Sequence, residues 1–229
     1  MTPAPDQRGS PSSDESSCAT PLSATSAEQC AQRAGLIQEL GRRPCLDDRP
    51  RIHDHDVVAE EELSVEALAR YDGLILSPGP GVPAEYPRTR DAIRYAVEHA
   101  LPVLGICLGH QALAEFFGGE LVQLPRPLHG HASRFVGIDP EDEVVGTIPE
   151  GSTIGRYHSW AVKPSSLPES LIVTGWSRDS GEAEVIMSLR HRTRPVWSVQ
   201  FHPESMITFG GERYLGGFLE AVRRRSLHP

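Results

Sequence analysis

Gly105-Ile106-Cys107-Leu108-Gly109-His110-Gln111 is the stretch that decides the expected fold. It places a cysteine between two glycines, directly after the apolar residues 101–104 and directly before a helix-like segment, residues 111–117. A strand, a sharp turn and a helix with Gly-x-nucleophile-x-Gly form a nucleophile elbow, in which glycine permits strained backbone angles. The helix directs its N–H groups and positive dipole end toward the sulfur, which favours the thiolate. The stretch therefore predicts a nucleophilic Cys107, although an isolated cysteine in apolar surroundings is more often an inert packing residue.

A candidate base for this cysteine follows a second predicted strand, far along the chain. Residues 196–201 alternate in the way of a half-buried strand, and His202-Pro203-Glu204-Ser205 comes directly after them. A catalytic cysteine needs a neighbouring imidazole to deprotonate it, and the imidazole needs an acceptor that orients it. Pro203 restricts the turn through its fixed φ. We interpret His202 as the base and Glu204 as its orienting group, although the pattern by itself would favour a solvated surface turn.

A third stretch offers hydrogen-bond donors to the reaction. Residues 73–77 are typical of a buried strand, and Pro78-Gly79-Pro80-Gly81 follows them. Gly79 and Gly81 keep their N–H groups and lack Cβ, while the prolines stiffen the loop. Such a loop can present a fixed donor to a developing oxyanion. Taken alone, the same residues would more often form a simple tight turn after a strand.

Together these three stretches resemble the class I glutamine amidotransferases, whose characteristic segments occur in this order and at similar separations. The matching segments are Ser77-Pro78-Gly79-Pro80-Gly81, residues 105–111 and Gln200-Phe201-His202-Pro203-Glu204-Ser205. Residues 128–133 resemble the family's His-Gly-Lys-x-Ser segment, with His131 in place of lysine. Residues 156–160 resemble the Arg-Tyr-His-Ser-Leu segment of chorismate-linked members, with Trp160 in place of leucine. The resemblance covers residues 63–219, and five segments in register make it specific.

The resemblance implies a glutaminase that works through a glutamyl-thioester. Cys107 would attack the side-chain amide of glutamine, His202 would act as base and then as acid for the leaving ammonia, and Glu204 would orient His202. The N–H groups of Gly79 and Leu108 would hold the oxyanion. The residues that match glutamine-binding positions are Gly79, Pro80, Gly81, Gln111, Ser159 and Trp160. The resemblance implies no metal or organic cofactor on this chain, with Mg²⁺ expected only on a synthase partner.

The fold implied by the resemblance is α/β, with a mostly parallel central sheet flanked by helices and with additional antiparallel strands. The residue pattern agrees with this class. It predicts helices over residues 89–100 and 211–224, and short strands near residues 120–124, 133–138, 171–176 and 184–189. The helix over residues 89–100 lies between two predicted strands, which is the order that builds a parallel sheet.

The first part of the chain departs from the family pattern, in which an apolar strand usually begins the sheet. Residues 1–25 are rich in Ser, Pro, Thr and Asp and are predicted to form a disordered tail. Residues 26–229 then make up the amidotransferase domain. A helix capped by Ser26 is predicted over residues 26–41. The family's first strand is therefore expected to be missing or altered.

Charge and cysteine content restrict the function classes. A net charge of −9 and a pI near 5.6 argue against nucleic acid as the partner. No segment has the length of a membrane helix, and four cysteines give no disulfide framework, which favours a cytoplasmic protein. His53-Asp54-His55-Asp56 offers at most two metal ligands. Because no further cluster completes a site, no metal centre is predicted.

The expected partner follows from the chemistry of ammonia. Ammonia released into neutral water is mostly protonated and no longer nucleophilic, so domains of this family usually feed a synthase through a protected route. The 229 residues leave no room for a synthase domain, which implies a separate chorismate-using subunit. Anthranilate synthase of tryptophan biosynthesis is the first expectation. The alternatives are the aminodeoxychorismate synthase of folate biosynthesis, which residues 188–192 favour, and a non-catalytic subunit, which the altered first strand favours.

Overall fold

The protein is described by a computed structural model, which places residues 37–41, 57–58, 68–179 and 183–227. Within these ranges one sheet has nine strands. Their spatial order is β2 (Val57–Val58), β1 (Ile37–Gly41), β3 (Tyr71–Leu76), β4 (Val103–Ile106), β11 (Val196–Val199), β10 (Val185–His191), β9 (Leu171–Arg178), β6 (His131–Val136) and β7 (Ser152–Arg156). A second, small sheet pairs β5 (Leu121–Gln123) with β8 (Trp160–Val162).

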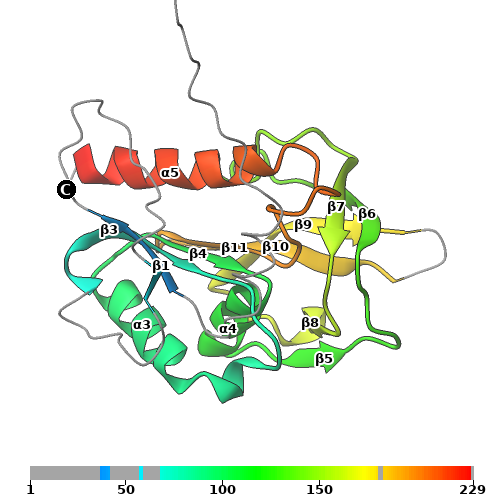
Figure 1. Ribbon diagram of the computed structural model, residues 1–229, viewed down its shortest axis with the longest axis horizontal. Coiled ribbons are helices and arrows are strands. Elements are labelled where there is room, and N and C mark those ends of the chain that lie inside the picture. Colours follow the sequence, from blue (N-terminus) through cyan, green and yellow to red (C-terminus); the bar gives the residue numbers. More distant parts are fainter. Residues whose placement is uncertain (1–36, 42–56, 59–67, 180–182, 228–229) are drawn as a thin grey trace, which may run out of the picture.

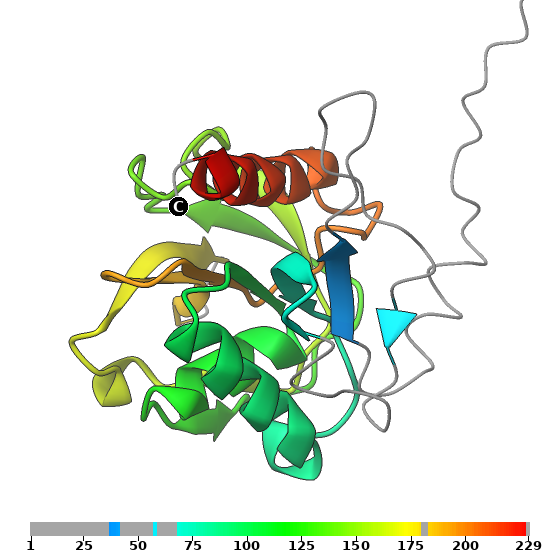
Figure 2. The same ribbon diagram turned by 90° about the vertical axis from the view of Figure 1, so that its left-hand side faces the viewer.

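Helices cover both faces of the large sheet. Figure 1 shows α5 (Gly211–Leu227) over one face, and α3 (Pro87–Glu98) and α4 (Leu108–Phe116) over the other. The turned view in Figure 2 shows the same three layers. Two short 3₁₀ helices, η2 (Pro83–Glu85) and η3 (Pro164–Ser166), lie in the connections. No helix in the described part of the chain is long and apolar enough to cross a lipid bilayer.

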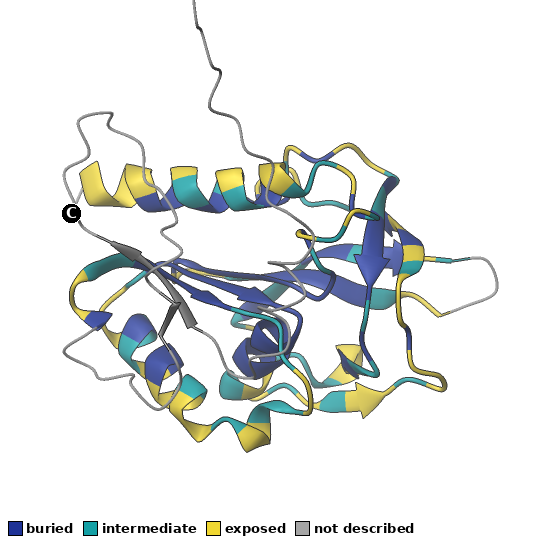
Figure 3. Ribbon diagram, in the orientation of Figure 1, coloured by how far each residue is buried: buried dark blue, intermediate teal, exposed yellow. Residues whose placement is uncertain are grey.

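The helices are held to the sheet by their apolar stripes. Figure 3 shows that α3 and α5 are buried on the side facing the sheet and exposed on the opposite side, whereas α4 is buried nearly all round. On α5, Phe218 packs edge-on to Trp197 of β11, and Tyr214 packs edge-on to Phe201. On α3, Ile93 is buried in a second cluster with residues of β3, β4 and α4. Burial of these stripes is the main force that closes the three-layer structure.

The centre of the sheet is parallel and its flanks are antiparallel. β4 pairs in parallel with β3 on one side and with β11 on the other, whereas all other neighbours in this sheet pair antiparallel. The α/β class predicted from the sequence is confirmed, and the sheet is mixed rather than mostly parallel. The strand predicted from residue 196 onward is confirmed as β11, but it is fully buried rather than half-buried. A strand covered by helices on both faces has no solvent side.

Residues 37–41 correct the helix that was predicted over residues 26–41. They form strand β1, which pairs antiparallel with β3 and places Ile37 opposite Leu76. The edge of β3 offers N–H and C=O groups that need partners, and this tertiary contact outweighs the local helical spacing. Residues 1–36 and 53–56 lie outside the described residues. The predicted tail, the boundary at residue 26 and the rejected metal site therefore stay predictions.

The other predicted elements are confirmed with small shifts of their ends. The helices expected over residues 89–100 and 211–224 are α3 and α5, and the four short strands are β5, β6, β9 and β10. β7 and β8 were not predicted. β8 has only three residues, and β7 contains a glycine and an arginine, so neither has an apolar pattern long enough to stand out.

Candidate active site

Cys107 lies at the turn between β4 and α4, with φ 51° and ψ −98°. A positive φ is rare for a residue with a side chain, so the strain of this turn is carried by the cysteine itself. The glycines beside it have a different role from the one predicted, since neither has a positive φ. A Cβ on Gly105 would lie 2.6 Å from the carbonyl oxygen of Gly109, and a Cβ on Gly109 would collide with the carbonyl oxygen of Leu76. They allow the strand and helix to approach closely.

The parallel pairing of β4 and β11 brings the predicted catalytic residues together. Both strands end at the same edge of the sheet, and the N–H of Cys107 donates to the carbonyl oxygen of Val199, the last residue of β11, at 2.8 Å. The chain continues from Val199 to His202, so the histidine follows the neighbouring strand at the edge where the cysteine stands. This is the edge at which open α/β sheets bind their ligands.

His202 interacts with Glu204 on one side of its ring and with Cys107 on the other. Its Nδ1 lies 2.7 Å from Glu204 Oε1. Its Nε2 is buried and makes no hydrogen bond of ordinary geometry among the described residues. Hydrogen bonds between a catalytic base and its nucleophile are often long or poorly aligned when no substrate is bound. Burial alone would lower the pKa of His202, but interaction with Cys107 and with Glu204 outweighs burial and raises the pKa to about 10. The histidine is therefore protonated between a sulfur and a carboxylate.

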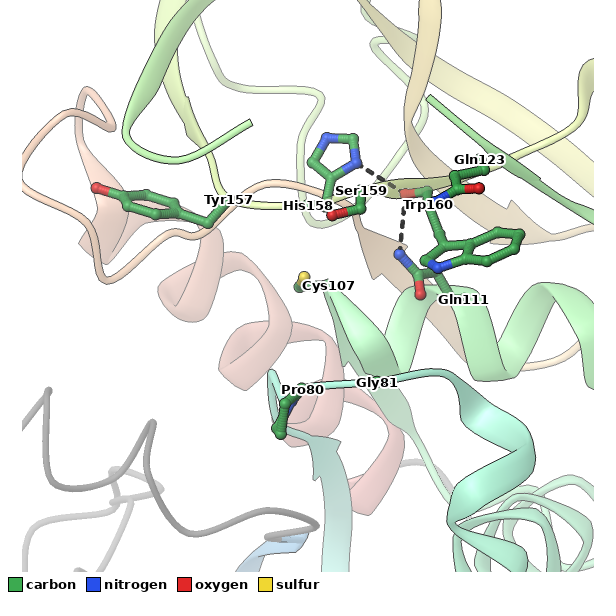
Figure 4. Close-up of a pocket in the computed structure, with 10 residues that line it drawn as sticks. Pro80, Gly81, Cys107, Gln111, Gln123, Tyr157, His158, Ser159 and Trp160 are labelled. Atoms are coloured by element: carbon green, nitrogen blue, oxygen red, sulfur yellow. Dashed lines mark hydrogen bonds between the residues drawn. The ribbon is translucent and has the colours of Figure 1, made fainter. Parts of the chain in front are cut away.

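Beside Cys107 lies a cavity of about 350 Å³. Its lining comes from the loop after β3, from α4, from β5 and from the segment between β7 and β8 (Figure 4). The lining residues are Gly79, Pro80, Gly81, Cys107, Gln111, Gln123, Tyr157, His158, Ser159 and Trp160. The cavity is large enough for one small molecule and opens onto the sulfur.

A hydrogen-bonded network holds one wall of this cavity. The carbonyl oxygen of Trp160 accepts from Gln111 Nε2 at 3.0 Å and from His158 Nδ1 at 2.8 Å (Figure 4). His158 Nε2 accepts in turn from the guanidinium of Arg156 at 3.1 Å. Burial and the positive charge of Arg156 lower the pKa of His158 to about 3. The imidazole is therefore neutral and carries its proton on Nδ1, because a carbonyl oxygen can only accept.

The predicted site residues are gathered in one place. The predicted glutamine-binding residues Gly79, Pro80, Gly81, Gln111, Ser159 and Trp160 all line the cavity. Leu108 is the first residue of α4 and lies next to Cys107, although it is not among the lining residues. His202 interacts with Cys107 from outside the lining, and Glu204 contacts His202.

Sequence reasoning missed Gln123, Tyr157 and His158 as lining residues. Tyr157 and His158 stand in the stretch already noted for its resemblance, so their place was open to prediction. Gln123 had no such signal, because it reaches the cavity only through the pairing of β5 with β8, opposite Trp160. His131, noted as a departure from the family pattern, lies outside the cavity, with Nε2 at 3.4 Å from Asp179 Oδ2.

Comparison with known proteins gives consistent matches. The family model described as glutamine amidotransferase class-I matches residues 45–222. Anthranilate synthase component 2 of Pseudomonas aeruginosa is 42% identical over 167 residues, which cover 71% of this chain and 81% of that protein. Aminodeoxychorismate synthase of Streptomyces griseus is 43% identical over 157 residues, which cover 69% of this chain. The match spans only 21% of the Streptomyces griseus protein.

A solved structure supports the same assignment at the level of the fold. It is a crystal structure of a Thermoplasma acidophilum protein that is proposed to be part of a GMP synthase. The two chains are 25% identical and align with a TM-score of 0.63, over 72% of this chain and 79% of the other.

Proposed function

Because this chain belongs to the class I glutamine amidotransferase family, we propose that it is the glutaminase subunit of a chorismate-using synthase and hydrolyses L-glutamine to supply ammonia. The observation that carries the proposal is the arrangement of Cys107, His202 and Glu204 beside a cavity of about 350 Å³. A cavity of this size, with a few convergent polar groups, suits a small molecule. A thiolate held next to an imidazolium suits acyl transfer.

In the first half of the reaction the Cys107 thiolate attacks the side-chain amide carbon of glutamine and a C–S bond forms. The N–H groups of Gly79 and Leu108 donate to the oxygen that becomes negative. As the first residue of α4, Leu108 has an N–H without an acceptor inside the helix, and the helix dipole adds positive potential there. His202 gives its Nε2 proton to the amide nitrogen. The C–N bond breaks, ammonia leaves, and a glutamyl-thioester remains on Cys107.

In the second half neutral His202 takes a proton from water, and the hydroxide formed adds to the thioester carbon. The C–S bond then breaks, glutamate leaves, and the thiolate–imidazolium pair is restored. Glu204 stabilises the imidazolium in both halves through its contact with Nδ1. Each step is a proton or acyl transfer by these side chains, so the proposal assigns no metal or organic cofactor to this chain and leaves Mg²⁺ to the synthase partner.

The cavity wall indicates how glutamine is held. Both hydrogens of the Gln111 amide nitrogen are used, one by Trp160 and one by Gln200. The carbonyl oxygen of Gln111 is therefore the atom left to accept a hydrogen bond from the substrate ammonium. We place the rest of the substrate against Gly79, Pro80, Gly81, Ser159 and Trp160, which share the same cavity.

The ammonia is delivered to a partner subunit that binds chorismate, which we propose to be that of anthranilate synthase. The relative from Pseudomonas aeruginosa supports this choice, since the match covers most of that protein. The alternative, aminodeoxychorismate synthase, is supported by the relative from Streptomyces griseus at nearly the same identity.

One experiment tests the activity and the product together. The purified chain is assayed for glutamate release alone, with the large subunit of an anthranilate synthase and with that of an aminodeoxychorismate synthase, and anthranilate and aminodeoxychorismate are scored separately. We expect glutamine-dependent anthranilate formation. Aminodeoxychorismate as the only product would replace the first choice by the alternative. Absence of glutamate release in every pairing would favour the non-catalytic subunit instead.

A further inference from the structure

Gln200 has no role in the steps above, although it is fully buried beside the site. It directly follows β11, and its backbone N–H donates to the carbonyl oxygen of Met187 in β10 at 2.8 Å. Its side chain lies between two groups of the site. Oε1 accepts from Gln111 Nε2 at 3.1 Å, and Nε2 lies 3.7 Å from the sulfur of Cys107. A buried amide that contacts both a cavity wall and the nucleophile is well placed to act on the reaction.

The direction of the Gln200 amide is imposed by its neighbours. The carbonyl oxygen of Trp160 can only accept, so the Gln111 atom next to it is the amide nitrogen. The second hydrogen of that nitrogen points to Gln200 and requires an acceptor, which is Oε1. The opposite end of the Gln200 amide is therefore Nε2, a donor, and this end faces Cys107. Three hydrogen bonds in series thus orient an N–H toward the sulfur.

We propose that Gln200 is a further catalytic residue, whose amide N–H donates to the sulfur of Cys107 and stabilises its anionic form. The inference rests on the proposed function, in which Cys107 is the nucleophile. A buried thiolate has little water around it and needs donors from the protein, and a donor to a charged acceptor is worth more than a neutral pair. A separation of 3.7 Å is within the range of N–H···S contacts.

This donor complements His202. The imidazolium loses its proton to the leaving ammonia and is charged again only after it takes a proton from water. The amide of Gln200 cannot lose a proton, so its N–H still faces the sulfur when the C–S bond breaks and the thiolate leaves. Gln200 would therefore assist both the attack and the departure of Cys107.

The test measures how fast Cys107 is alkylated by iodoacetamide as a function of pH. In the protein used for this test, Cys18, Cys30 and Cys45 are each replaced by serine, so that Cys107 is the only thiol left in the chain. Gln200→Glu keeps an acceptor for Gln111 but replaces the donor at the sulfur by a carboxylate oxygen. We expect the pH of half-maximal alkylation to rise by at least about one unit, the equivalent of one hydrogen bond to a charged group. A midpoint at or below that of the unsubstituted chain would overturn the proposal.

A second variant and a control complete the experiment. Gln200→Met removes both hydrogen bonds without adding charge, and its midpoint should also rise. It decides the question if Gln200→Glu does not fold. Ser188→Ala is the control, because Ser188 is equally buried on β10 and its hydroxyl accepts from Thr174. It should lower the melting temperature and leave the midpoint unchanged.

Alkylation needs neither glutamine nor a partner subunit, so the measurement remains informative if the proposed function fails. That failure would appear instead as glutamine-dependent activity retained by Cys107→Ser.

Discussion

At the scale of single residues, the site concentrates backbone strain on Cys107. Its φ of 51° is a conformation that costs on the order of 1–3 kcal/mol for a residue with a side chain and persists only where the surroundings enforce it. Here the enforcement comes from the hydrogen bond to Val199 on one side and from the first turn of α4 on the other. The strained turn exposes the sulfur to both the cavity and His202.

Cys107→Ser is expected to abolish glutamine-dependent synthesis and to preserve synthesis from added ammonia. A serine hydroxyl is hardly ionised near neutral pH, so the attack on the amide carbon should slow by several orders of magnitude. The two activities are measured side by side in the complex with the synthase subunit. Cys45→Ser serves as the control and should change neither. Glutamine use retained by Cys107→Ser would remove Cys107 from its proposed role.

His202→Ala is expected to be nearly as damaging as loss of Cys107, and Glu204→Ala less damaging. The imidazole takes part in both proton transfers, whereas the carboxylate orients the ring and stabilises its charge. Steady-state glutaminase kinetics on the two variants give the ranking. The assignment of the two roles fails if kcat/KM falls further in Glu204→Ala than in His202→Ala.

At the scale of elements, the site depends on how closely α4 approaches β3 and β4. Gly105 and Gly109 face each other across the turn, and Gly109 also rests on the carbonyl oxygen of Leu76 in β3. This contact sets the position of the N-terminus of α4, and with it the N–H of Leu108. If a methyl group at Gly109 pushed α4 away from β3, the N–H of Leu108 would move away from the sulfur of Cys107.

Gly109→Ala should therefore destabilise the protein and lower glutaminase activity together, because the new Cβ collides with backbone atoms of Leu76 that cannot rotate away. The matched control is Gly216→Ala in α5, where, apart from the adjoining residues and backbone of the helix itself, no described atom lies within 4 Å of the added Cβ. Alanine has the higher helix propensity, so this change should stabilise by about 0.5–1 kcal/mol. The free energy of unfolding of each variant is measured with urea, and glutaminase activity is assayed on the same preparations. Equal effects in the two variants would contradict the close contact.

At the scale of the whole molecule, two neutral histidines are built into the buried structure. His110 is fully buried on α4 and contacts the hydroxyl of Ser198 in β11 at 2.9 Å. Burial first, and the nearby His158 second, lower the pKa of His110 to about 3. His158 has a similarly low pKa, through burial and the charge of Arg156. The His110 ring joins α4 to β11, and the His158 ring is buried between Arg156 and Trp160, so protonating either ring opposes the folded structure.

Acid is accordingly expected to destabilise the protein below about pH 6.5, the pKa of both histidines when unfolded. Between that pH and about 3, the unfolded chain binds two protons that the folded chain does not, so stability falls as pH falls. The slope is up to about 1.4 kcal/mol per pH unit for each histidine. The raised pKa of the buried Asp142 acts in the opposite direction and reduces the net slope. His202 contributes its stabilisation below pH 6.5 and loses it as pH rises through about 10.

The measurement is urea unfolding at a series of pH values from 8 to 4, on the unsubstituted chain and on His110→Asn. Asparagine keeps a polar atom near the position of Nδ1, for contact with Ser198, and does not titrate. The variant should be less stable at pH 7 but should lose stability less steeply below pH 6.5. Parallel pH profiles of the two proteins would show that His110 is not the titrating group.

The sequence by itself determined the chemistry of this protein and the approximate place of most elements. Cys107 between glycines, His202 with Glu204, and the loop from Pro78 to Gly81 are local patterns, and each was open to prediction because the chemistry requires these residue types at short spacing. The apolar stripes of α3 and α5 were open to prediction for the same reason, since helical periodicity is a local property.

Only the tertiary structure decided those features that depend on contacts between segments distant in sequence. Residues 37–41 form a strand because the edge of β3 pairs with them, although their spacing favours a helix. Gln123 reaches the cavity through β8, and Gln200 is oriented by Gln111 and Trp160. The mixed pairing of the sheet likewise depends on which strands become neighbours. A local pattern fixes what a residue can do, but only the packed chain fixes what it touches, because burial and hydrogen bonding join segments that are far apart in sequence.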